Sequence, residues 1–274
     1  MFERSGQLKF AHVFKSECAD IIAQHNVLAK NVINSDETRF QFGSQKMASL
    51  HVQGAKTVYI KGSRNDKRGV SVLASIAADG SRLPLAFIFK GKKGPKNLTI
   101  PEPHLKFTSG KGWMNEVIWL QYAKKVWFTR APSQHLVHVY TYASHNSDNY
   151  LHACTNHNVH NVNVPAAMTG TLQPFDRLVD GPWKNAVAHA INEYYEVNEN
   201  DISWQQLIDI IIAKWNENMS QVLVEKSFAK TGVIKHSIYK EDIPIEPPVA
   251  RNTTSVRQVL KLNLFHLSLL LKNQ

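Results

Sequence analysis

The chain has 274 residues, of which 43% are hydrophobic and 20% are charged. These proportions are ordinary for a packed globular protein and exclude a chain that is disordered throughout. Lysine and arginine outnumber aspartate and glutamate by 32 to 22, which gives a formal net charge of +10. A balance this basic favours a polyanionic partner, and nucleic acid is the first candidate.

The cysteines and the chain ends indicate the compartment. Cys18 and Cys154 lie far apart in the sequence, so no disulfide framework is indicated and a reducing compartment is expected. The N-terminus, MFERSGQLKF, lacks the apolar core of a signal peptide. The most apolar stretch, 262–271, is about half as long as a membrane span and predicts a terminal helix. We therefore expect a soluble intracellular protein without a membrane partner.

The first half of the chain predicts a helix followed by strands. Apolar residues at helical intervals predict a helix over 10–25, and NVINSDE at 31–37 predicts a short strand that ends on acids. KTVYIKG, at 56–62, opens a predicted β-meander. Its next strand runs from Val70 to Ile76, ADGSR forms the turn, and the return strand covers Leu83 to Phe89.

The second half alternates between strands and helices. Strands are predicted at 136–142 and 157–165, and helices at 112–130, from about Pro182, at 203–218 and at 221–233. A proline-containing linker and the apolar helix follow residue 236. Strands that come first and then alternate with helices predict an α/β domain with a mixed sheet.

Two carboxylates follow predicted strands in places that suggest chemistry. Asp36 ends the first strand, and Asp176 comes just before a helix. Carboxylates that converge from separate strand ends suit two divalent metal ions, because hard cations prefer oxygen ligands. Two such ions can clamp the attacking and leaving oxygens of a phosphodiester. Spacing alone makes this a weak signal, since any surface carries acids where loops begin.

Ordered motifs from about residue 18 to 234 resemble the DDE-superfamily transposases of the pogo, Tigger and jerky type. The segments that carry the resemblance are IIAQHNVLAKNVINSDET, VYIKGSRNDKRGVSVLASIAADGSRLPLAFIFKGK, GWMNEVIWLQYAKKVW, VPAAMTGTLQPFDRLVDGPWKNAV and WNENMSQVLVEKSFAKTGV. The resemblance implies an RNase H-like fold with a mixed five-stranded sheet flanked by helices. It also implies an acid triad that binds two Mg²⁺ or Mn²⁺ ions for DNA cleavage and strand transfer. Asp36 matches the first acid and Asp176 the third, as catalytic and metal-binding residues.

The second acid of the triad is missing. In the family it lies five residues before a histidine, in the pattern D-[NS]-x-x-[SG]-H, and Ser144 with His145 matches the end of that pattern. Tyr140 stands five residues before this histidine, and Thr141 takes the place if the loop has lost one residue. Neither side chain is an anion at neutral pH. We therefore expect impaired catalysis, with Asp148 as a weak candidate for a substitute ligand.

The resemblance also sets the expected domains. Residues 1–30 are a helical lead-in without a complete helix-turn-helix DNA-binding domain, which active members of the family carry. Residues 31–235 form the DDE domain, and 236–274 hold the linker and the apolar helix. The family implies a location in the nucleus. Specific recognition of transposon ends is expected to be lost, or never to have been part of this gene model.

Basic loops are the expected contacts to DNA phosphates. RNDKR at 64–68 and KGKKGPK at 90–96 gather positive charge, which supplies sequence-independent and salt-dependent affinity. The expected nucleic-acid-binding residues are Lys67, Arg68, Lys90, Lys92, Lys93 and Lys96.

Other side chains have plainer interpretations. The histidines and the cysteine of HACTNHNVH, at 152–160, suggest zinc, but their spacing matches no standard finger, so exposed loop histidines are the better prediction. Trp113, Trp119 and Trp127 share one predicted helix and are expected in the core. Glu37 should point away from Asp36, because neighbouring residues of a strand face opposite sides.

The sequence therefore predicts a transposase-derived RNase H-like domain, a decayed or co-opted nuclease that binds DNA without sequence preference. An active endonuclease with a substitute ligand is one alternative. A protein-interaction module that uses the apolar C-terminal helix is another, and a homo-oligomer remains open.

Overall fold

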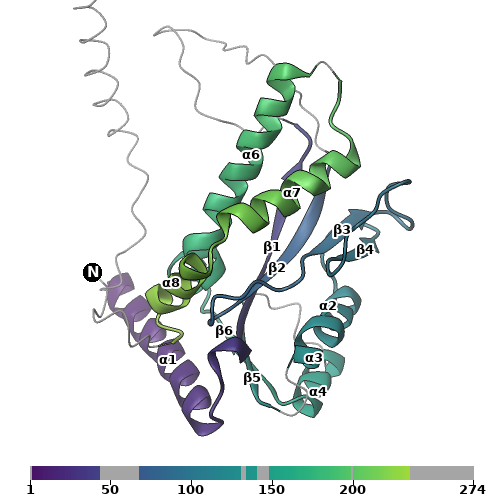
Figure 1. Ribbon diagram of the computed structural model, residues 1–274. Helices are drawn as coiled ribbons and strands as arrows, with labels where there is room; N and C mark the ends of the chain where they lie inside the picture. Colours follow the sequence, from purple (N-terminus) through teal and green to yellow (C-terminus); the bar gives the residue numbers. More distant parts are fainter. Residues whose placement is uncertain (1, 44–67, 131–133, 141–147, 199, 235–274) are drawn as a thin grey trace, which may run out of the picture. The chain divides into compact units, whose positions relative to one another are not determined.

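A computed structural model describes residues 2–43, 68–130, 134–140, 148–198 and 200–234 (Figure 1). The chain divides into two units, Met1–Glu241 and Asp242–Gln274, and every described residue belongs to the first. The predicted strand at 56–62 and the predicted terminal helix at 262–271 lie outside the described residues. Within the described residues, no helix is long and apolar enough to cross a membrane.

The described strands form one mixed sheet in the order β4-β3-β2-β1-β5-β6. They are β1 (Val32–Gln41), β2 (Gly69–Ala77), β3 (Ala86–Lys90), β4 (Leu105–Ser109), β5 (Leu136–Tyr140) and β6 (Val159–Asn163). The pairs β1–β2 and β2–β3 are antiparallel, and β1–β5, β5–β6 and β3–β4 are parallel. The predicted α/β class with a mixed sheet is confirmed. The predicted count of five strands is wrong, because the described residues contain six.

The additional strand is β4, at the edge of the sheet. It pairs only with β3 among the described strands, and Phe107 is its one buried side chain. The alternation of LKFTS is too weak to stand out from the surrounding loop, so sequence patterning does not find it.

Helices cover both faces of the sheet (Figure 1). The helical elements are α1 (Phe2–Gln24), η1 (Ala29–Asn31), α2 (Glu116–Tyr122), η2 (Ala123–Trp127), α3 (Phe128–Arg130), α4 (Asp148–Asn156), α5 (Thr169–Leu172), η4 (Phe175–Val179), α6 (Asp180–Val197), α7 (Trp204–Asn218) and α8 (Gln221–Thr231). The helix predicted at 112–130 is continued by a π-helical turn, η2, and α4 was not predicted. Ser203 and Gln206 form a capping box that starts α7, and Gly232 ends α8 with φ +73°.

Aromatic residues fill the core on each face. Ile33 of β1 belongs to a buried cluster with Trp119 and Trp127, beneath α2 and η2. On the other face, Phe40 of β1 packs edge-on against Trp183 of α6, with 4.8 Å between ring centroids. Trp119 and Trp127 are buried as predicted, whereas the prediction for Trp113 is wrong: its side chain is 49% exposed, because it precedes α2.

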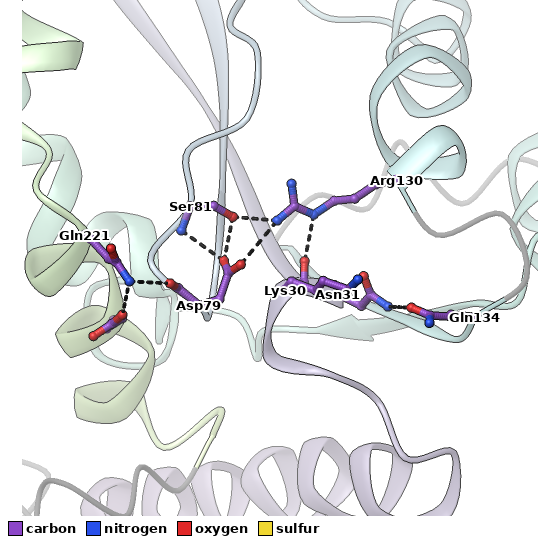
Figure 2. Close-up of polar contacts among 8 residues, drawn as sticks. Lys30, Asn31, Asp79, Ser81, Arg130, Gln134 and Gln221 are labelled. Atoms are coloured by element: carbon purple, nitrogen blue, oxygen red, sulfur yellow. Dashed lines mark hydrogen bonds and ion pairs between the residues drawn. The ribbon is translucent and has the colours of Figure 1, made fainter.

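A polar clamp secures the turn between β2 and β3 (Figure 2). Asp79 accepts hydrogen bonds from the backbone nitrogen and the hydroxyl of Ser81. Arg130 of α3 donates to the Ser81 hydroxyl and to the carbonyl of Lys30, and pairs with the Asp79 carboxylate at 3.5 Å. Gln221 of α8 donates to the Asp79 carbonyl at 3.2 Å. One turn thus joins elements from both faces of the sheet.

Candidate active site

The two predicted acids meet on one face of the sheet. Asp36 lies in β1, and Asp176 lies in the π-helical turn η4, immediately before α6. In its protonated form the Asp36 carboxyl donates a hydrogen bond to the Asp176 carboxylate. π-Helical turns of this kind occur often at functional sites. The fold therefore brings together the two carboxylates that the sequence singled out.

Asn34 holds the segments around this pair in place. Its side chain is fully buried and donates from Nδ2 to the carbonyl of Val139 in β5 at 2.9 Å. Its Oδ1 accepts a hydrogen bond from the backbone nitrogen of Phe175 at 2.7 Å. One amide thus ties β1 to β5 and to η4, next to both acids. Sequence reasoning missed this residue, although it opens the NSDET segment.

A third carboxylate lies near the pair, and sequence reasoning also missed it. Asp180 starts α6 one turn after Asp176, and its negative charge contributes to the raised pKa of Asp36. Its Oδ2 accepts from Lys184 Nζ at 2.7 Å. Its Oδ1 is buried and has no hydrogen-bond partner among the described residues. The spacing of four residues was the available signal, since it places both acids on one side of a helix.

Burial and neighbouring charge make the ionised form of Asp36 costly. Burial raises the pKa of Asp36 well above its ordinary value, and the Asp176 carboxylate raises it further. Two carboxylates that repel each other in this way suit a hard divalent cation, because the positive charge of the ion offsets the repulsion. The residues present therefore fit Mg²⁺ or Mn²⁺.

This electrostatic cost predicts a pH-dependent difference between the natural chain and Asp36→Asn in chelator. Below about pH 4 the natural carboxyl is protonated in both folded and unfolded chains, so it adds no penalty. As pH rises through the raised folded pKa of Asp36, the natural chain loses stability that Asp36→Asn keeps. Melting temperatures from pH 4 to 8 should diverge in favour of the variant. Asp209→Asn, an exposed change on α7, should show no such divergence, and parallel curves for Asp36→Asn would contradict the prediction.

The strand that should deliver the second acid carries Tyr140 on the opposite face. Asn34 pairs with Val139, so these two side chains share a face, and Tyr140 faces the other side. Its ring stacks on His138, with centroids 5.0 Å apart, and lies 6.4 Å from Trp119. Burial, followed by the charge of Cys154, raises the pKa of Tyr140.

Other residues of the sequence motifs lie away from the pair or outside the described part of the chain. Glu37 accepts a hydrogen bond from the backbone nitrogen of Met114 at 3.3 Å, on the face opposite Asp36, as predicted. Asp148 is exposed in the first turn of α4. Thr141, Ser144 and His145 lie outside the described residues.

The predicted basic contacts lie on the surface where the structure describes them. They cluster at the end of β3, in the loop that follows it, and just before β2. Arg68, Lys90, Lys92, Lys93 and Lys96 are exposed. The Arg68 guanidinium lies 5.0 Å from the centre of the Phe42 ring, and Lys67 is outside the described residues.

The residues of HACTNHNVH do not gather into a finger. His152 is exposed on α4, Cys154 is buried as a free thiol, and His157 stacks on Phe128 at 4.1 Å. Cys18 is also buried and free, which agrees with the expectation that no disulfide joins the two cysteines.

The pattern of one protein family, described as DDE superfamily endonuclease, matches residues 66–240. The chain belongs to this family. Asp176 lies inside the matched segment of this DDE domain, and Asp36 precedes it. The predicted membership is therefore confirmed, and the transposase-derived nuclease fold follows from it.

Two curated relatives of the DDE domain are described as "Pogo transposable element with KRAB domain". The mouse protein is 22% identical over 262 residues, which cover 85% of this chain and 42% of the relative. The human protein is 25% identical over 174 residues, covering 60% of this chain and 27% of the relative. The chain thus spans less than half the length of either relative.

Solved structures of Mos1 resemble the fold. The Mos1 mariner paired end complex with Mg has a TM-score of 0.53 at 12% identity, and covers 82% of this chain and 59% of the Mos1 chain. The paired end complex with Mn has a TM-score of 0.52 at 11% identity, covering 82% and 60%. At this identity the likeness concerns the fold alone, and it supports the predicted RNase H-like architecture.

Proposed function

We propose that this DDE domain still binds DNA but has lost its nuclease activity. The observation that carries the proposal is the lack of an acid at the end of β5, where Tyr140 faces away from Asp36 and the next residue is Thr141. Asp36 and Asp176 without an acid from β5 neutralise less charge than the full triad does. Stabilisation of the transition state at bound metal ions should then fall by orders of magnitude.

Asp36 and Asp176 are the residues that would hold Mg²⁺ or Mn²⁺. Such ions, when bound, supply Lewis-acid activation of water and stabilisation of the leaving oxygen. The solved Mos1 complexes with Mg and with Mn support a role for these ions in relatives. The contribution of this chain is to keep both carboxylates on one face, through the buried amide of Asn34.

The exposed lysines beyond β3 are proposed to contact DNA phosphates without reading sequence. The net charge of +10 and the clustering of Lys90, Lys92, Lys93 and Lys96 support this. Contacts to phosphates position a protein on DNA without reading its sequence.

DNA binding can be tested by its salt dependence. In Lys92→Ala/Lys93→Ala, affinity for a random duplex should fall, and the slope of log K against log salt should shrink by about two units. Fluorescence anisotropy across a salt series measures both. Lys226→Ala/Lys230→Ala removes the same charge from α8 and should leave the slope nearly unchanged. Equal effects of the two double variants would mean that the affinity for DNA depends on net charge alone and not on the lysines beyond β3.

The proposed loss of nuclease activity can be tested by plasmid nicking with Mn²⁺. The natural chain and Asp36→Asn should nick at the same background rate. If the natural chain nicks and Asp36→Asn does not, the proposed impairment is wrong.

Asp180 favours the alternative of an active endonuclease. This carboxylate lies near Asp36 and Asp176, and one of its oxygens is buried without a partner among the described residues. It is therefore a better substitute ligand than the exposed Asp148. Under this alternative the natural chain nicks DNA, and Asp180→Asn abolishes nicking while Asp148→Asn does not.

The remaining expectations complete the proposal. We propose the domain bounds 1–30, 31–235 and 236–274, a location in the nucleus, and DNA as the main partner. A homo-oligomer and protein binding through the apolar segment at 262–271 can be tested by the molar mass in solution, with and without residues 236–274.

A further inference from the structure

Three histidines from distant parts of the sequence meet at one edge of the sheet. His25 follows α1, His135 precedes β5, and His160 lies in the edge strand β6. Their ring centroids are 4.1 Å apart for His25–His135, 4.4 Å for His25–His160 and 5.1 Å for His135–His160. One ring nitrogen of each can be chosen so that all three lie within 4.8 Å of one another. All three residues are half-buried.

The backbone fixes each histidine independently. After His25, the chain closes α1 with Asn26 in the left-handed region, at φ +49°, and with a hydrogen bond from Val27 N to the Ile22 carbonyl. This is a regular helix ending, and it sets where His25 points. His160 pairs with Val137 in the parallel β5–β6 ladder, two residues after His135. Regular backbone thus presents His25 and His160, and β5 begins directly after His135, which reduces the cost of ordering the rings around a ligand.

The rings of His135 and His160 are in hydrogen-bonding contact. His135 Nδ1 and His160 Nε2 are 2.8 Å apart, so one of these nitrogens donates a proton to the other and at least one is an acceptor. A neutral imidazole is the form that binds a metal ion.

We propose that His25, His135 and His160 form a zinc-binding site. Imidazole nitrogens suit Zn²⁺ and are poor ligands for Mg²⁺, so this site differs in chemistry from the carboxylate pair. Three protein ligands with water in the fourth position is a common zinc arrangement. Nitrogens bound to one tetrahedral Zn²⁺ lie about 3.3 Å apart, given bonds of about 2.0–2.1 Å. To admit the ion, the His135–His160 pair needs to open by about half an ångström, and nitrogens that are up to 4.8 Å apart need to close by about 1.5 Å.

The site would anchor α1 to the edge of the sheet. His25 belongs to the end of α1, whereas His135 and His160 belong to the parallel pair β5–β6. Bound zinc would add a cross-link between segments that otherwise meet by packing. The ion would also lie toward the start of β5, whereas Asp36 lies beyond the last β1–β5 residue pair, Asn34–Val139.

Zinc titration of the whole chain tests the proposal. Calorimetry in buffer with excess Mg²⁺, which occupies carboxylate sites, should give about one Zn²⁺ per chain. His25→Ala, His135→Ala and His160→Ala should each weaken zinc binding by at least about tenfold. His152→Ala and His157→Ala remove histidines from the same region and should bind zinc as the natural chain does. Equal losses in all five variants, or no zinc binding by the natural chain, would overturn the proposal.

Three further measurements exclude an effect of misfolding. Circular dichroism without zinc should be the same for each variant and the natural chain. With Co²⁺ in place of Zn²⁺, the natural chain should show the strong visible absorption of a four-coordinate nitrogen site, and the three variants should lose it. In hydrogen exchange, zinc should slow the last turns of α1 only when all three histidines are present. A six-coordinate Co²⁺ spectrum in the natural chain would reject the site without reference to any variant.

Discussion

Plasmid nicking with Mn²⁺ is expected to rise by about 100-fold or more when Thr141 is replaced by aspartate, and to stay at background for Tyr140→Asp. Tyr140 stacks on His138 and lies near Trp119, on the face away from Asp36. A carboxylate there would be buried among aromatic rings and could not join the acid pair. Of the two residues that the motif allows for the second acid, Thr141 is then the one to test.

The controls separate restored chemistry from a change in charge. Thr141→Asn has nearly the same size as the aspartate and should stay at background. Thr141→Asp combined with Asp36→Asn should also stay at background, because the first acid is then missing. Nicking by Tyr140→Asp would mean that β5 can turn this position toward Asp36, which contradicts the described packing.

Asn34→Ala is expected to lower the free energy of unfolding by about 2–5 kcal/mol, since it leaves two buried backbone groups without partners. These are the Val139 carbonyl and the Phe175 nitrogen, which the Asn34 side chain joins at 2.9 Å and 2.7 Å. Loss of the link should also loosen η4 and therefore the position of Asp176. Denaturant unfolding measures the first effect.

An exposed asparagine is the matched control. Asn198 donates from its side chain to the Tyr194 carbonyl at 2.8 Å in a solvent-exposed position. Asn198→Ala should cost less than about 0.5 kcal/mol, because water replaces the lost partner. A similarly small cost for Asn34→Ala would show that water or a backbone shift satisfies the two orphaned groups.

The sequence predicts the two acids of the site better than the residues that surround and position them. Asp36 and Asp176 could be identified because ordered motifs surround each of them. Asn34 could not, because an asparagine in a strand gives no sign that both ends of its amide will be buried. Asp180 could not, because its relation to Asp176 depends on a helical turn beginning before α6.

The limits of the fold prediction have the same origin. Strands with several buried β-branched residues, such as β2, were found because their pattern is strong. β4 and α4 were missed, since each has only one or two buried side chains among polar neighbours. The cluster of three histidines was also missed. The sequence groups His160 with its neighbours in the chain, whereas its ring contacts His25 and His135.

The Asn34 amide also has a consequence for synthesis of the chain. Its partner at Phe175 lies 141 residues later, and its partner at Val139 lies 105 residues later. At about 5–20 residues per second, a ribosome needs about 7–28 seconds to make the 141 residues from Asn34 to Phe175. β1 can pair with β2 early, but its other edge stays open until β5 has been made, and its acid-bearing face stays open until η4 has been made. The nascent domain is therefore exposed to wrong strand pairing for longest at the strand that carries Asp36.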